Sequence, residues 1–304
     1  MRDAFFEELH TLFCKDERVV FLTGDLGYKL FAPLLETDPT RVVNVGIREA
    51  AMVGFAAGLA KMGRLPFVYS IVPFLTLRCL EQIKLDLCYN QQRVVLVGVG
   101  GGFTYGPNGP THHGVDDIGV LSTLPNLHCW TPATPREVRS FVEHAPELDS
   151  SAYLRLGRNG EADLELPTGK PGGPILVCEG EDGTIVSYGT ILHEVLKAVE
   201  LLKQEGLRPR VLHLPSLHPD VEATLLHLLS DGRPCMTVEE HVATGGLGQR
   251  LGSTLARNGR SVPFEALSIP DRFPDACYRH AAALAWAGID AGSIAKRYQD
   301  FVNA

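Results

Sequence analysis

The sequence lacks the features that would direct it to a membrane or to a nucleic acid. No run of about eighteen uninterrupted apolar residues is present, which is roughly the length that a membrane-spanning helix requires. The first residues, MRDAFFEELH, carry charges where a secretory signal would have its apolar core. The formal net charge is -8, and lysine and arginine are scattered, so no basic surface is expected to attract a polyanion. We therefore expect a cytoplasmic protein that binds neither membranes nor nucleic acids.

Paired cysteines and internal repeats are absent as well. The 7 cysteines are dispersed, no two form a C-x-x-C pair, and most have apolar neighbours. This pattern favours reduced thiols in the protein interior over disulfide bonds or a zinc site. No repeat with a period of about 20 to 50 residues occurs, which excludes a solenoid.

The sequence does contain a regular alternation of short β-rich segments with longer helical segments, which is typical of βα units around a parallel sheet. Predicted strands occupy 18–24, 41–46, 66–70, 93–100, 127–132 and 152–157, and predicted helices occupy 48–63, 74–90 and 134–145. After residue 182, strands at 183–189, 208–214, 233–240 and 262–269 alternate with helices at 192–206, 221–231 and 245–259. The stretch in between is rich in glycine, proline and charge, as linkers are. The predicted fold is α/β, with two doubly wound domains of mainly parallel sheet at 1–160 and 183–304, joined by a linker at 161–182.

A carboxyl group lies at the start of the helix predicted in the segment VNVGIREAAMVGFAAGLAKM. A strand ends at Gly46, and the helix that follows is small and apolar around most of its circumference, so we expect it to be buried on several sides. Glu49, in its first turn, either only complements the positive end of the helix dipole or, in apolar surroundings, shares a proton with a ligand nitrogen. The residue pattern alone leaves both roles open.

The segment GIREAAMVGFAAGLA resembles the part of transketolases and related thiamine enzymes that reads GIRE or AIAE before a helix of small residues. The resemblance implies that Glu49 hydrogen-bonds the N1′ atom of the aminopyrimidine of thiamine diphosphate. There it would promote the imino tautomer, whose nitrogen removes the thiazolium C2 proton. Glu49 is thus expected to be both a cofactor-binding and a catalytic residue, in the manner of a positioned acid–base group.

Three further residues are assigned to the cofactor by the same resemblance. Phe74 follows Glu49 by 25 positions (74 − 49) and would stack on the pyrimidine ring, where the generic alternative is a phenylalanine of the core. Tyr69, at the end of the preceding strand, is a further candidate for lining the same pocket. Asp25 follows the first strand in LTGDLG, where the family often has an acidic residue near the cofactor.

The glycine-rich segment GVGGGFTYGPNGPTHHGVDDIGVL carries the candidates for sugar recognition. Transketolases read DGPTHQ or DGQTHQ at this place, so His112 is expected to contact the sugar and to donate to a developing alkoxide as a catalytic group. Adjacent side chains of an extended segment point to opposite sides, so His112 and His113 are not expected to chelate a metal together. Asn108 replaces the aspartate that reads a donor hydroxyl in the family, and His113 replaces glutamine. The sugar specificity of ordinary transketolases therefore does not carry over.

The strand end AYLRLGRNG resembles the family's arginine-bearing strand, which binds the substrate phosphate. Guanidinium groups suit phosphates because they form paired, charge-assisted hydrogen bonds. Arg158 fits the pattern best and Arg155 is its rival, and the alternative role of either is a surface ion pair.

A magnesium site is not provided by the sequence. In the family a GDG…N motif binds the ion that holds the diphosphate, but LTGDLG lacks the second glycine and Asn44 follows too soon. The TGGLG turn at 244–248 also occurs in carboxy-terminal transketolase domains, where it carries no cofactor. A diphosphate needs a divalent cation with oxygen ligands or a glycine loop at a helix start. We therefore expect no metal ligand in this chain and Mg²⁺ bound by another polypeptide.

We hypothesise a subunit of a split transketolase, a transferase that is active only with an N-terminal partner subunit, in an α2β2 assembly with thiamine diphosphate at subunit interfaces. It would transfer a two-carbon ketol unit from a ketose phosphate to an aldehyde acceptor. One alternative is the β subunit of a 2-oxoacid dehydrogenase or decarboxylase, which shares the two-domain layout and the glutamate; GIRE and GPTHH favour the transketolase. Another is a nucleotide-binding or structural α/β subunit without catalysis, against which stands the joint presence of Glu49, Phe74 and His112.

Overall fold

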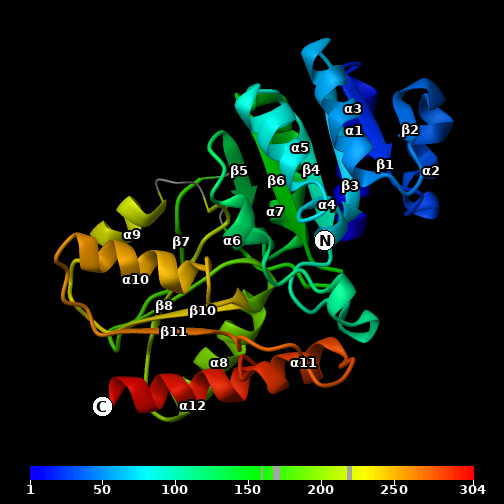
Figure 1. The fold of residues 1–304 in the computed structure, drawn as a ribbon. Helices are drawn as coiled ribbons and strands as arrows, with labels where there is room; N and C mark the ends of the chain where they lie inside the picture. The colour runs from blue at the N-terminus through cyan, green and yellow to red at the C-terminus, as the bar shows by residue number, and fades with distance from the viewer. Residues whose placement is uncertain (159, 167–171, 218–220) are drawn as a thin grey trace.

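The computed structural model describes residues 1–304 except 159, 167–171 and 218–220, and it contains two sheets flanked by helices (Figure 1). The first half of the chain forms a 6-stranded sheet and the second half a 5-stranded sheet. The predicted fold class, α/β with two mainly parallel sheets, is confirmed.

The first sheet is parallel throughout, and its strands have the order β2-β1-β3-β4-β6-β5. These strands are β1 (Val19–Thr23), β2 (Val42–Asn44), β3 (Leu65–Ile71), β4 (Val95–Val99), β5 (Leu127–Trp130) and β6 (Ser151–Leu156). Val20 and Leu22 point into the core on one face, and Val19 and Phe21 point into the core on the other. Because both faces are buried, the strands are almost continuously apolar in sequence.

Helices cover both faces of this sheet. They are α1 (Arg2–Lys15), α2 (Tyr28–Thr37), α3 (Glu49–Lys61), α4 (Val72–Leu75), α5 (Leu80–Gln82), the π-helix η2 (Ile83–Tyr89), α6 (Asp117–Leu121) and α7 (Pro135–His144), with short 3₁₀ turns η1 (Pro39–Arg41), η3 (Gly106–Asn108), η4 (Pro110–His112) and η5 (Ala145–Glu147). α1 and α7 pack together on one face, and α3 and η2 pack together on the other. α7 begins where its sequence predicts, because Thr134 caps the amide of Glu137 and Pro135 occupies the first turn.

The second sheet has the strand order β11-β10-β8-β9-β7, in which β7 is antiparallel to β9 and the other neighbouring pairs are parallel. Its elements are β7 (Ile175–Cys178), β8 (Thr184–Ser187), η6 (Gly189–Ile191), α8 (Leu192–Gln204), β9 (Arg210–His213), α9 (Val221–Leu228), β10 (Cys235–Val242), α10 (Leu247–Arg257), β11 (Phe264–Ile269), α11 (His280–Ala287) and α12 (Ala291–Val302).

The observed elements differ from the predicted ones in several respects. β7 lies inside the predicted linker 161–182, because the surrounding glycine and proline conceal a short edge strand. The predicted helix 74–90 is divided into α4, α5 and the π-helix η2. The remaining predicted helices and all predicted strands coincide with observed elements, whereas α1, α2, α6, α11 and α12 were not predicted.

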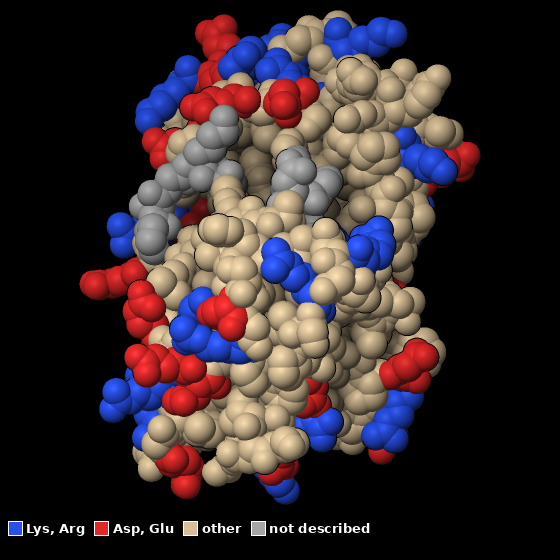
Figure 2. Space-filling model, turned by 90° about the vertical axis from the view of Figure 1, so that its left-hand side faces the viewer, with Lys and Arg blue, Asp and Glu red and all other residues tan. Residues whose placement is uncertain are grey.

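The two domains are joined by backbone hydrogen bonds and by a shared apolar core. The amide of Thr131 donates to Pro215, and the amide of Leu217 donates to Cys129, each over 2.8 Å. The face drawn in Figure 2 shows acidic and basic side chains interspersed, without a large patch of either sign. Within the described residues, no helix has the length and apolar character needed to cross a membrane.

Candidate active site

The predicted site residues lie beyond the carboxyl ends of parallel strands of the first sheet. Glu49 opens α3 after β2, Phe74 lies in α4 directly after β3, and His112 ends η4 in the loop that follows β4. Since β2, β3 and β4 belong to one parallel sheet, their carboxyl ends share one edge, which is where ligands bind in open α/β sheets.

Glu49 is buried and forms an ion pair. Its carboxyl group is 2% exposed, and its Oε2 accepts a hydrogen bond of 2.7 Å from the guanidinium of Arg78. Gly24 lies close by, and a Cβ atom at Gly24 would be 3.7 Å from the Cγ of Glu49. Glu49 is thus more than a partner for the helix dipole, because a buried carboxylate is retained only where it is paired.

Arg78 connects Glu49 to the aromatic part of the site. Its guanidinium carbon lies 4.5 Å from the ring centroid of Phe74, a cation–π contact. The half-buried ring of Phe74 in turn meets the ring of His112 edge to face, with 5.1 Å between centroids. The structure therefore brings together all three residues whose joint presence pointed to catalysis.

Arg158 joins the same cluster through Tyr105. The ring of Tyr105 lies 6.0 Å from that of His112, and the guanidinium carbon of Arg158 lies 4.5 Å from the Tyr105 centroid. Arg158 is exposed, and no carboxylate among the described residues lies within ion-pair distance of it. Neither Arg78 nor Tyr105 was singled out from the sequence, since an arginine in an amphipathic segment and a tyrosine in a loop give no signal by themselves.

The two adjacent histidines have different neighbours, and His112 ends the 3₁₀ turn η4 rather than lying in an extended segment. His112 is half-buried, and its Nδ1 lies 2.9 Å from the hydroxyl of Thr111. His113 is 6% exposed, and its Nε2 lies 3.2 Å from the backbone oxygen of Gly106. Burial lowers the pKa of His113. Asn108 is exposed in the same loop.

Arg155 does not join the cluster. Its Nε donates to Asp117 over 2.9 Å, and its Nη2 donates to the backbone oxygen of Gly114 over 2.7 Å. The ion pair considered as its alternative role does exist, but it is buried rather than on the surface. Of the two arginines considered for a phosphate, only Arg158 presents its guanidinium to solvent.

Tyr69 and Asp25 occupy different surroundings. Tyr69 is 2% exposed and packs against Phe5 and Phe6, with centroid distances of 6.1 and 5.1 Å, so its ring belongs to the core under α1. Burial raises its pKa. Asp25 is exposed, adopts a left-handed φ of 64°, and accepts hydrogen bonds from Tyr28 and Asn44, which lower its pKa. Asp25 thus lies at the same edge of the sheet as Glu49, whereas the ring of Tyr69 packs in the core under α1.

α3 buries one part of its surface, with Met52, Val53 and Ala56 in the core, and leaves another part exposed. Ala51, Phe55, Gly58 and Met62 are exposed and follow one another at helical spacing along one stripe of the helix. Leu85 and Tyr89 of the neighbouring η2 are exposed too. The exposed residues of this stripe therefore form a surface of the isolated chain.

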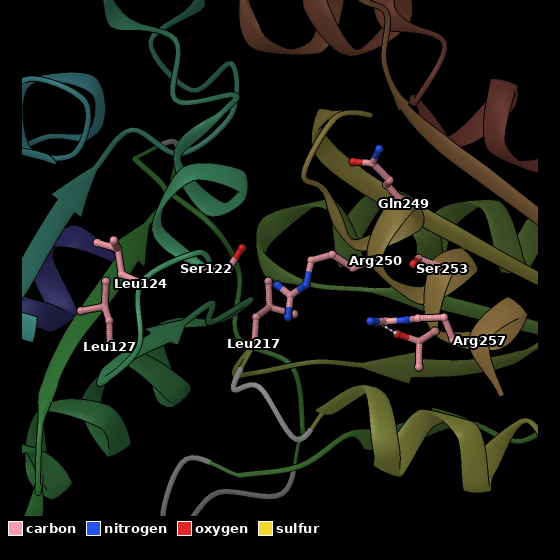
Figure 3. A pocket seen from close by; sticks show the side chains of 9 residues that line it. Ser122, Leu124, Leu127, Leu217, Gln249, Arg250, Ser253 and Arg257 are labelled. Atoms are coloured by element: carbon pink, nitrogen blue, oxygen red, sulfur yellow. Dashed lines mark hydrogen bonds between the residues drawn. The ribbon is translucent and has the colours of Figure 1, made fainter. Parts of the chain in front are cut away.

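Cavities also lie outside this cluster. One, of about 620 Å³, lies between α10 and the segment before β5 (Figure 3) and is lined by Ser122, Leu124, Leu127, Leu217, Gln249, Arg250, Ser253, Thr254 and Arg257. This cavity lies next to the amino end of β5, because Leu127 lines it, and none of its lining residues belongs to the cluster. Another, of about 430 Å³, lies between the domains next to Phe74 and His112, because its lining includes Pro73, His113 and the segment 269–274. In the described part of the chain, no three histidine, cysteine, aspartate or glutamate side chains are grouped so that they could hold a metal ion.

Comparison with known proteins identifies the two domains. Residues 1–160 match the family described as "Transketolase, pyrimidine binding domain", and residues 173–294 match "Transketolase, C-terminal domain". The chain is 34% identical to one of the subunits of the apulose-4-phosphate transketolase of Phocaeicola vulgatus, over 99% of this chain and 97% of that protein. It is 32% identical to the corresponding subunit from Actinobacillus succinogenes, over 86% of this chain and 85% of that protein.

The fold leads to the same family. A solved structure described as "Split gene transketolase, inactive beta4 tetramer" superposes with a TM-score of 0.85 at 27% identity, covering 99% of this chain and 97% of the other. Both domains and nearly the whole length are thereby accounted for. The chain belongs to the transketolase family, as the subunit of a split transketolase that carries the pyrimidine-binding and C-terminal domains.

Proposed function

We propose that this subunit forms one side of a thiamine diphosphate site and transfers a two-carbon ketol unit from a ketose phosphate to an aldehyde. The observation that carries the proposal is the buried carboxylate of Glu49, 2% exposed, beside the half-buried ring of Phe74. A carboxyl group and an aromatic face at the open edge of a parallel sheet suit an aminopyrimidine, which offers a ring nitrogen and a flat apolar surface.

Each residue of the cluster has a distinct part in this proposal. When bound, the cofactor supplies a carbon nucleophile and an electron sink for the donor carbonyl. Glu49 holds a proton at the pyrimidine ring nitrogen, and Phe74 fixes the plane of that ring. His112 donates a hydrogen bond to an oxygen of the donor sugar, where negative charge develops. Arg158 binds the phosphate of the substrate through its exposed guanidinium.

We infer that magnesium and the diphosphate are bound by an N-terminal partner subunit. The sequence of this chain provides no GDG…N motif, and relatives of nearly the same length are named as single subunits of a transketolase. The exposed apolar stripe of α3, with Met62 81% exposed, supports association with another chain, because monomeric proteins rarely leave such a surface open. We propose an α2β2 assembly in which this stripe is covered.

The nature of the donor follows from the polar groups of the cluster. Arg158 and His112 suit a phosphorylated sugar, and the name of the relatives, which contains apulose-4-phosphate, supports a sugar phosphate as well. Asn108 is exposed near His112. It places a neutral amide where ordinary transketolases have a charged hydrogen-bond acceptor. This favours a donor sugar whose hydroxyl groups are arranged differently from those of the usual transketolase donors.

The test is ketol transfer by this chain mixed with a candidate N-terminal subunit. With thiamine diphosphate, Mg²⁺, a ketose phosphate and an aldehyde acceptor, the mixture is expected to form the longer ketose, and neither subunit alone is expected to do so. Pyruvate offered as the donor separates this function from that of a 2-oxoacid dehydrogenase subunit. Turnover of pyruvate without turnover of any ketose phosphate would contradict the proposal.

A further inference from the structure

The loop that carries His112 is closed at its base and attached to the second domain. Gly102 and Gly114 exchange two backbone hydrogen bonds of 2.7 and 3.0 Å, which close the loop between them. One residue further on, the backbone oxygen of Val115 accepts a hydrogen bond of 2.8 Å from the amide of Val242 in β10. The end of β10 thus lies directly beneath the loop.

Glu240 of β10 is the side chain at this junction. Its Oε1 accepts a hydrogen bond of 2.6 Å from the amide of Phe103 and lies 2.9 Å from Nε2 of His280, the first residue of α11. The carboxylate is buried, with the residue 1% exposed. Arg155 ties the backbone of the same residue to the loop, since its Nη2 donates to the oxygens of both Glu240 and Gly114.

The glycines of the loop allow this close approach. Gly102 has a φ of +63°, and a Cβ atom there would lie 2.1 Å from the carboxyl carbon of Glu240. A Cβ atom at Gly106 would lie 2.3 Å from the backbone oxygen of Tyr278, just before α11. No other residue type fits such contacts, so the loop is shaped to lie against the second domain.

We propose that Glu240, together with His280, is a positioning residue that holds the sugar-recognition loop so that His112 faces Phe74. The inference rests on the proposed function, because His112 is the group that is positioned. It gives the second domain, which carries none of the predicted catalytic residues, a part in substrate recognition. Glu240 acts through the Phe103 amide and the closed loop, not through contact with the substrate.

The two oxygens of the carboxylate make the residue well suited to a matched pair of variants. Oε1 takes both hydrogen bonds, and Oε2 has no hydrogen-bond partner among the described residues. In Glu240→Gln the amide oxygen can take the place of Oε1, so the Phe103 amide keeps its acceptor. In Glu240→Ala the buried amide of Phe103 and the imidazole of His280 both lose their partner, which is the costly case.

The first experiment measures loop order in the full chain without any partner. Hydrogen–deuterium exchange of peptides spanning 101–114 is expected to be about tenfold faster in Glu240→Ala than in the wild type and close to wild type in Glu240→Gln. Glu265→Ala, on the neighbouring β11, is the control, because it removes a carboxylate that pairs with Arg297 at the surface. If Glu240→Ala fails to fold, His280→Gln replaces it, with faster exchange expected in the same peptides. Unchanged exchange in the folded variant overturns the inference.

The second experiment uses the assembled enzyme and separates the two ligands. Glu240→Ala is expected to raise the KM for the ketose phosphate about tenfold while the KM for thiamine diphosphate stays within about twofold, and Glu240→Gln should restore most of the difference. The inference is overturned if both KM values rise equally or if neither KM value rises. An inactive wild-type assembly would instead count against the proposed function, and the exchange result would still decide how the loop is held.

Discussion

Arg78 donates a hydrogen bond of 2.7 Å to Glu49, and the two side chains differ strongly in exposure, with 47% for the arginine and 2% for the glutamate. The guanidinium therefore covers the carboxylate on the side that faces solvent. It also lies against the ring of Phe74. A ring nitrogen that reaches Glu49 must pass beside this guanidinium, so Arg78 belongs to the entrance of the proposed cofactor site.

Replacing Glu49 tests the catalytic assignment. Glu49→Gln keeps the shape of the side chain and an oxygen for Arg78 but cannot exchange a proton. We expect ketol transfer to fall about 10²- to 10⁴-fold, the range typical of a lost acid–base group, with the thermal midpoint nearly unchanged. Steady-state rates of the assembled enzyme measure the effect, and Glu36→Gln, an exposed glutamate of α2, is the control. Full activity of Glu49→Gln would refute the assignment.

The ion pair itself can be tested by a double-mutant cycle. Arg78→Met leaves the carboxylate of Glu49 buried without its partner, and we expect it to lower the free energy of unfolding by about 1 to 3 kcal/mol, the cost of an unsatisfied buried group. Arg78→Met combined with Glu49→Gln should recover part of this loss, because the uncompensated charge is then gone. Urea unfolding of the isolated chain measures all three variants. If the losses of unfolding free energy in the two single variants added up to the loss in the double variant, Arg78 and Glu49 would have no coupling energy.

The sequence was sufficient to place the candidate residues at the ends of strands, because strand periodicity and motif order are local properties. Glu49, Phe74 and His112 each follow a strand that is recognisable by its apolar residues, and parallel strands necessarily place such positions at one edge. The edge strand β7 was missed because glycine and proline surround it, and the division of the helix predicted at 74–90 was missed because its apolar spacing suits one continuous helix.

Which side chains meet across elements could not be read from the sequence. Tyr69 and Val68 are neighbours in β3, yet only the packing of α1 decides that Tyr69 lies in the aromatic core on the far face. Arg155 and Arg158 differ by three positions, but only the tertiary contacts of Arg155, with Asp117 of the first domain and with Glu240 of the second, decide that it is buried at the junction. Arg78 was recognised as part of the candidate site only from its hydrogen bond to Glu49 in the structure.

Replacing Arg158 tests the phosphate assignment. A charge-assisted hydrogen bond to a phosphate contributes roughly 1.5 to 3 kcal/mol, so Arg158→Ala should raise the KM for a ketose phosphate about 10- to 100-fold. The rate with an unphosphorylated ketose should change little, because that donor lacks the group that Arg158 binds. Arg260→Ala, an exposed arginine after α10, is the control. If activity with the phosphorylated donor and activity with the unphosphorylated donor fell equally, Arg158 would not bind the phosphate but would maintain the structure of the site.

The pair of Glu240 and His280 predicts how stability depends on pH. Burial alone would lower the pKa of His280, but the carboxylate of Glu240 outweighs it and raises that pKa above its ordinary value. Burial alone would raise the pKa of Glu240, but His280 and the Phe103 amide lower it. The histidine therefore contributes stability that is complete below its unfolded pKa of about 6.5 and is lost as the pH rises through its folded pKa.

Thermal midpoints of the wild type and of His280→Gln between about pH 5.5 and pH 9 measure this contribution. The wild type is expected to be more stable than the variant at the acidic end, and the difference should shrink towards the alkaline end. A difference that grew with increasing pH would contradict the charged pair.

The exposed stripe of α3 gives the last prediction. Phe55 and Met62 lie two helical turns apart on the same face, and Tyr89 of η2, 80% exposed, extends the surface. Covering such side chains stabilises an assembly by roughly 25 cal/mol for each Å² of apolar surface removed from water, so a charge placed there must oppose association. Phe55→Glu is expected to shift sedimentation of the subunit mixture towards the separate chains and to abolish ketol transfer, while the fold of the isolated chain stays intact by circular dichroism.

Leu201→Glu, at an exposed apolar position on α8 of the second domain, should leave the assembly unchanged. If Phe55→Glu assembled like the wild type, the stripe would not be the surface that another chain covers.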